Sequence, residues 1–185
     1  MKKTIQTLAI ASIALFTITS CDNDDDVTII NEEEVITTVI YTLTNTADAT
    51  DEVVFRSLDA DGEGPNDPVE TVIGDITANT NYTGSVQFLN ELESPAEDIT
   101  EEVLEEADEH EVFYNATVNG VSITKTDVDP DGNPLGLRTT FNTGAAGTGN
   151  LTIVLRHEPT KPNDNTLTGA GGETDVEVTF DFQVQ

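Results

Sequence analysis

The two histidines are the first residues of this chain that could carry chemistry, and each is embedded in acid. The sequence has Glu109-His110-Glu111 at one position and His157-Glu158 at the other. Neutral imidazoles together with carboxylates are ligands that zinc, copper and nickel prefer. If the strands that carry the histidines are antiparallel neighbours, both imidazoles reach the same rim. The sequence then predicts a divalent metal site, with candidate ligands His110, His157, Glu106, Glu109 and Glu158. The alternative is two exposed histidines among acidic neighbours.

An acidic loop offers a second candidate site. Asp127-x-Asp129-x-Asp131-Gly132-Asn133 matches the opening of a calcium loop, with carboxylates at positions 1, 3 and 5 and glycine at position 6. Position 12 would be Arg138, where such loops place a bidentate glutamate. The expected affinity for Ca²⁺ is therefore weak, roughly 10⁻⁴–10⁻³ M. The alternative is an acidic turn, because Asp, Gly, Pro and Asn build turns without any ion.

The single cysteine, Cys21, lies directly between an apolar run and a block of acid. Lys2 and Lys3 precede an apolar segment that is too short to span a bilayer, which is typical of a secretory signal. The four residues Ile18-Thr19-Ser20-Cys21 resemble a lipobox. We therefore expect residues 1–20 to be a lipoprotein signal peptide and Cys21 to be acylated and hold the protein at a membrane. The alternatives are a plain signal peptide with a chance cysteine, or a free thiol.

The composition after the predicted signal peptide limits the partners. Residues 21–185 contain five Lys and Arg against 36 Asp and Glu, a formal charge of −31. Nucleic acid is excluded as a partner because its phosphates would be repelled. Residues 21–34 are rich in acid and predict a tether between the anchored cysteine and the folded domain.

Signatures of enzymes are missing from the sequence. It has no G-x-S-x-G, no H-E-x-x-H, no phosphate-binding loop and no second cysteine. Carboxylate pairs are abundant, but a glycosidase would also need aromatic platforms, and the chain has no Trp and three Tyr. We expect a protein that is not an enzyme.

The segments that must position these residues are mostly β-strands. β-branched and aromatic residues are concentrated at 35–44, 50–58, 69–73, 82–90, 111–118, 121–128, 135–142, 150–158 and 173–185. In the last segment, apolar residues from Val176 to Val184 alternate with polar ones, as in a half-buried strand. Asn119-Gly120 between two strand patterns predicts a hairpin. About nine strands at this spacing predict a mainly β fold, an Ig-like antiparallel β-sandwich over residues 35–185.

One segment, 94–110, has the pattern of a short acidic helix. Ser94 and Glu97 are spaced as a capping box, and Ile99, Val103 and Ala107 form a narrow apolar stripe. This helix lies between two stretches, 35–96 and 110–165, whose similar order of strands, acidic turns and glycines suggests an internal duplication.

Several runs of residues resemble known lipoproteins. The acid in CDNDDD resembles the signal that sends lipoproteins of Bacteroidetes-type bacteria to the cell surface. The runs ESPAEDITEEV (93–103), DPDGNPLGL (129–137), LRHEP (155–159) and AGGETDVEVTF (170–180) resemble a small uncharacterised flavobacterial lipoprotein family. Automated labels for that family read "type 1 periplasmic binding fold superfamily protein". The resemblance covers most of residues 21–185 and implies no established activity.

These observations predict a lipid-anchored accessory lipoprotein of the bacterial outer membrane. We expect it to face outward, with the periplasmic face as the alternative, and to bind a ligand or partner without catalysis. The more specific form of this hypothesis is that the protein captures Zn²⁺, Cu²⁺ or another divalent cation and passes the ion to an outer-membrane receptor. The competing hypothesis is a structural surface lipoprotein whose acidic side chains only keep it solvated and bind no small ligand.

Overall fold

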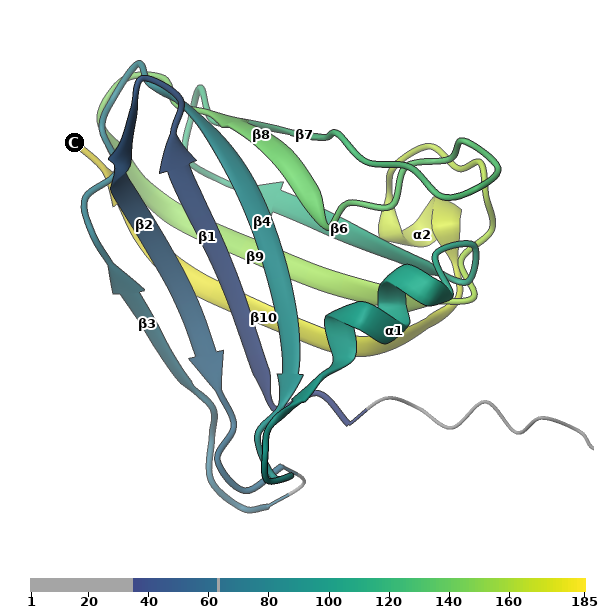
Figure 1. The fold of residues 1–185 in the computed structure, drawn as a ribbon. Helices are drawn as coiled ribbons and strands as arrows, with labels where there is room; N and C mark the ends of the chain where they lie inside the picture. The colour runs from purple at the N-terminus through teal and green to yellow at the C-terminus, as the bar shows by residue number, and fades with distance from the viewer. Residues whose placement is uncertain (1–34, 63) are drawn as a thin grey trace, which may run out of the picture. The chain divides into compact units, whose positions relative to one another are not determined.

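The computed structural model describes residues 35–62 and 64–185, which form two antiparallel sheets (Figure 1). The larger sheet has seven strands. They are β1 (Thr38–Asn45), β2 (Asp48–Leu58), β3 (Val69–Ile73), β4 (Asn81–Asn90), β5 (Glu97–Asp98), β7 (Ser122–Lys125) and β8 (Arg138–Asn142). Their order is β3-β2-β1-β4-β8-β7, and β5 pairs with β4. The predicted signal peptide, Cys21 and the tether to residue 34 lie outside the described residues.

The smaller sheet has three strands in the order β10-β9-β6. They are β6 (His110–Ala116), β9 (Gly147–His157) and β10 (Glu173–Val184). Two short helices, α1 (Ile99–Glu105) and α2 (Leu167–Ala170), complete the described fold. The prediction of a mainly β protein built from antiparallel sheets is confirmed. No helix among the described residues is long and apolar enough to cross a membrane.

One hydrophobic core joins the two sheets. Phe55 of β2 contacts the rings of Phe180 and Phe182 of β10 edge to face, at centroid distances of 5.4 and 5.9 Å. Tyr41 of β1 meets Tyr114 of β6 at 5.2 Å. Because such contacts join strands of different sheets, the arrangement is consistent with the predicted β-sandwich. The predicted alternation in β10 is also observed, with Val178, Phe180, Phe182 and Val184 buried and their neighbours exposed.

The Asn119-Gly120 turn forms, but the hairpin predicted from it does not. Gly120 has a positive φ of 82°, and the amide of Val121 donates to the carbonyl of Val118, which closes a tight turn. The strand before the turn, β6, pairs with β9, whereas the strand after it, β7, pairs with β8. The turn therefore carries the chain from one sheet to the other. The two strands that the turn connects therefore pair with other strands and not with each other.

Helix α1 starts later than the sequence predicts. Its N-cap is Asp98, whose side chain accepts a hydrogen bond from the amide of Thr100. The prediction of a capping box that starts at Ser94 is therefore wrong. The reason is that Glu97 and Asp98 pair with the end of β4 as the short strand β5. The apolar stripe is correct, because Ile99, Val103 and Ala107 are all buried. The helix packs beside β4 near the end that carries the histidines of the smaller sheet (Figure 1).

Candidate functional site

The two histidines lie side by side at one end of the smaller sheet. His110, the first residue of β6, is the register partner of His157, the last residue of β9. Their rings stack at a centroid distance of 4.9 Å and an interplanar angle of 10°. Both side chains lie on the core-facing side of their strands, where the next residues are Val112 and Leu155. The residues His110 and His157 are 1% and 8% exposed. The expectation that both imidazoles reach one rim is confirmed, but the alternative of exposed histidines is wrong.

Stacking prevents the two rings from converging on one ion. The lone pairs of an imidazole lie in its ring plane, so those of parallel rings run side by side. The Nδ1 atom of His110 lies 3.1 Å from the carbonyl oxygen of Glu106, which can only accept, so Nδ1 donates and Nε2 carries the lone pair. Burial lowers the pKa of His110, and the nearby His157 lowers it further. His110 is therefore a neutral, packed histidine beside the rim.

An aspartate that the sequence did not single out faces both rings. The Oδ2 atom of Asp175 lies 3.8 Å from His110 Nε2, and its Oδ1 atom lies 4.0 Å from His157 Nδ1. The side chain is only 1% exposed. Strict alternation along β10 would place Asp175 on the outer face, but the pairing of β10 with β9 shifts register between Thr174 and Val176. Asp175 is the extra residue of this bulge, and no local sequence signal marks it.

One cluster of possible metal ligands occurs among the described residues. Glu109, His157 and Glu158 can each offer one ligand atom, and these atoms lie within 4.8 Å of one another. The Nε2 atom of His157 is 3.9 Å from an oxygen of Glu109, whose side chain is 48% exposed. The amide of Glu158 donates to the Glu109 carbonyl at 2.7 Å, which holds the two glutamates together. The cluster thus combines one anchored imidazole with two movable carboxylates.

Three of the five predicted ligands are brought together, and two are not. His110 and Glu106 lie outside the cluster, although both contact its neighbours. Burial raises the pKa of the Glu106 carboxyl group, and repulsion from Glu109 and Glu102 raises it further. The Glu106 carbonyl serves instead to orient His110. The predicted set of ligands with two histidines is thereby reduced to a cluster of possible ligands with one histidine.

The predicted calcium loop is used as a turn. Asp129 is buried, and its Oδ1 atom accepts from the amides of Asp131 and Asn133, while Lys161 donates to its Oδ2 at 3.2 Å. Asp127 accepts from the amides of Gly136 and Arg138. A lysine ammonium therefore occupies the place of a cation beside Asp129, and the carboxylates do not form a cluster within the described residues. The arrangement favours the acidic turn, which was the alternative for this loop.

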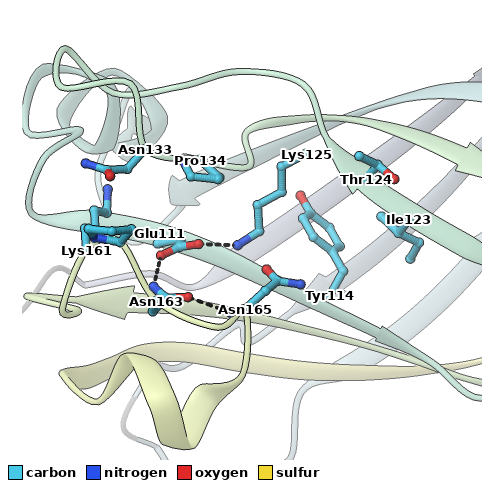
Figure 2. Close-up of a pocket in the computed structure, with 11 residues that line it drawn as sticks. Glu111, Tyr114, Ile123, Thr124, Lys125, Asn133, Pro134, Lys161, Asn163 and Asn165 are labelled. Carbon is cyan, nitrogen blue, oxygen red and sulfur yellow. Dashed lines mark hydrogen bonds and ion pairs between the residues drawn. The ribbon is translucent and has the colours of Figure 1, made fainter.

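A cavity that the sequence did not predict opens where the edge strands of the two sheets approach each other. It has a volume of about 310 Å³ and is walled by β6, by β7 and by the segments 133–134 and 161–165. Figure 2 shows the side chains of Lys125 and Glu111, two of its lining residues, pointing toward each other, and a hydrogen bond of 2.5 Å joins them. Residues from four separate segments meet here, so no motif in the sequence marks the cavity.

Comparisons with known proteins return no match for this chain. No protein-family model matches it. No curated protein and no solved structure shows significant similarity to it either. The function must therefore be inferred from the geometry of the sites.

Proposed function

We propose that this protein is a lipid-anchored extracytoplasmic accessory protein that captures a divalent transition metal ion without catalysing a reaction. The observation that carries the proposal is the cluster of Glu109, His157 and Glu158, whose ligand atoms lie within 4.8 Å of one another. Zn²⁺ is the first candidate because it accepts one imidazole and two carboxylates, and Cu²⁺ is the second. Ca²⁺ fits poorly because it takes six to eight oxygen ligands.

The surroundings of His157 support a role as the central ligand. Asp175 lies on the Nδ1 side of the ring, which favours a proton on Nδ1 and directs the lone pair of Nε2 toward Glu109. A histidine that binds a metal commonly has a carboxylate on the far side of its ring, which holds the ring in its orientation. The two glutamates are exposed and can close the remaining distance by rotation.

Three protein ligands leave one coordination position open. Such a site exchanges its ion with water or with another protein, unlike a closed structural site with four ligands. The formal charge of −31 on residues 21–185 raises the local concentration of cations around the protein. Both properties suit capture of an ion and its transfer to an outer-membrane receptor. Acylated Cys21 would hold the domain at the membrane, and the acidic tether would give it reach.

Isothermal titration of the purified protein with zinc tests the proposal. His157→Ala should abolish the binding, and Glu109→Gln or Glu158→Gln should each weaken it. Glu70→Gln is the matched control, because Glu70 is an exposed glutamate of β3 outside the cluster. Unchanged zinc affinity in His157→Ala would refute metal capture and would favour the structural surface lipoprotein.

A further inference from the structure

The cavity beside Lys125 combines unused polar groups with apolar walls. It lies between β6, the edge strand of the smaller sheet, and β7, the edge strand of the larger one. Its volume of about 310 Å³ is at the lower end of the range of roughly 300–1,000 Å³ found for small-molecule sites. Its lining includes none of Glu109, His157 and Glu158, and Glu111 points to the opposite side of β6 from His110. The cavity is therefore a candidate site of its own.

Lys125 brings donor capacity into this cavity. Its side chain is only 9% exposed, and its ammonium group lies 4.0 Å from the ring centroid of Phe113. Among the described residues its hydrogen-bond partner is Glu111. An ammonium group has three N–H donors, so donor capacity remains for a ligand. Lys161 differs, because it already donates to the carbonyls of Ala107 and His110 and to Asp129.

Acceptors and amides complete the polar lining. The second carboxylate oxygen of Glu111 accepts from the side chain of Asn163 at 2.7 Å, and a carboxylate has lone pairs for further donors. The side-chain amide of Asn165 also lines the cavity and makes no hydrogen bond within the described residues. Figure 2 shows the amides of Asn163 and Asn165 beside the Lys125–Glu111 pair. A ligand would thus meet donors and acceptors close together.

The charges at this site balance, which indicates a neutral ligand. Lys125 is paired with Glu111, and Lys161 is paired with Asp129. An anion would be repelled by Glu111 beside Lys125 and would have to approach a chain with a formal charge of −29. A cation would be repelled by the ammonium group of Lys125, which lies against Glu111. Neutral hydroxyl groups can donate and accept at once, so they satisfy a lysine, a carboxylate and amides without separating either pair.

We propose that this cavity binds a neutral, polyhydroxylated small molecule of about the size of a monosaccharide. Its hydroxyl groups would hydrogen-bond to Lys125, Glu111 and the amide of Asn165. Its apolar C–H face would pack against Tyr114 and Pro134, which supply apolar surface to the same lining. The binding is independent of the metal cluster and needs no ion.

Titration of the full chain with D-glucose, D-galactose and myo-inositol, followed by NMR in the presence of a metal chelator, tests this inference. We expect at least one of these probes to shift the amide signals of Lys125, Asn163 and Asn165. Asn165→Gly removes the amide at a residue whose φ is +60° and should weaken binding by roughly tenfold. Lys125→Met should weaken it as well.

Asn79→Gly is the matched control, because Asn79 is also an asparagine with positive φ, but it lies outside the cavity. This variant should bind the probe as the unmodified protein does. The inference is overturned if no probe shifts these signals, or if Asn165→Gly and Asn79→Gly bind equally well. Stronger binding of acetate or phosphate at the same residues would also overturn it. Failure here would leave metal capture untouched, because zinc is absent from the experiment.

Discussion

The imidazole rings of His110 and His157 are nearly parallel, and both face the same buried carboxylate, that of Asp175. This contact joins three strands, because the two histidines pair across β6 and β9 while Asp175 comes from β10. Two stacked rings cannot both become charged without repulsion at short range. The stack therefore links the protonation of the protein to its folding and to the side chains of the cluster of possible metal ligands.

Stability should fall as the pH is lowered from neutral. The pKa of His110 is lower in the folded protein than its ordinary value of 6.5, so the unfolded chain binds this proton more tightly. Below about pH 6.5 the unfolded state gains protons that the folded state lacks, and the free energy of unfolding decreases. The slope from this group is at most about 1.4 kcal/mol per pH unit. Urea unfolding between neutral and mildly acidic pH measures it.

The variant His110→Phe isolates this contribution, because it keeps a flat ring but removes the titrating group. Its stability should depend less on pH over the same interval. Glu106 acts in the opposite direction, because its raised pKa makes the folded state bind a proton more tightly as the pH falls. Equal slopes in the two proteins would contradict the prediction. The groups around His110 that share this environment are His157, Glu106, Glu109, Asp175 and Lys161.

Asp175→Asn should weaken zinc binding without removing any ligand of the metal. The substitution keeps the shape of the side chain but removes the charge that orients His157. Changes in such supporting groups typically reduce metal affinity by about 10–100-fold. Calorimetry with zinc measures the loss, and Asp181→Asn serves as the control because Asp181 is an exposed aspartate of the same strand. Identical zinc affinities for both variants would show that Asp175 does not support the site.

Replacing Lys161 with methionine should destabilise the fold by about 3–5 kcal/mol, because it leaves the buried carboxylate of Asp129 without its partner charge. The side chains of Lys161 and Asp129 are 6% and 0% exposed. Burial alone would raise the pKa of Asp129, but hydrogen bonds from Asn133 and Lys161 outweigh it and lower the pKa. Arg138→Met, at an exposed residue, should change stability by less than about 0.5 kcal/mol. Similar urea midpoints for the two variants would contradict this role of Lys161.

Gly84→Ala should destabilise the protein by about 1–3 kcal/mol through overpacking. A Cβ atom at Gly84 would collide with the hydroxyl groups of Tyr41 and Thr139, which hydrogen-bond to each other at 2.6 Å inside the core. Thermal unfolding of Gly84→Ala beside Ser85→Ala measures the effect, because Ser85 follows on the exposed face of β4. Equal melting temperatures for the two variants would show that the core rearranges to accommodate the added methyl group, and would contradict the prediction.

The cluster of possible metal ligands was only partly predictable. His157, Glu109 and Glu158 could be proposed because imidazoles beside acids are visible in the sequence. Asp175 could not, because its inward direction comes from a bulge in the pairing of β10 with β9. The cavity was equally hidden, since Glu111, Lys125 and Asn165 come from separate segments of the chain.

The sequence by itself determined the strands and the fold class, because alternation and β-branched content act within a few residues. Each of the nine predicted strand ranges overlaps a strand of the structure, and the apolar stripe of α1 is buried as predicted. The tertiary structure alone decided which strands pair. Asn119-Gly120 made the turn expected of it, yet β6 and β7 joined different sheets because pairing depends on partners distant in the chain. The same long-range pairing brought His110 against His157 and turned Asp175 inward.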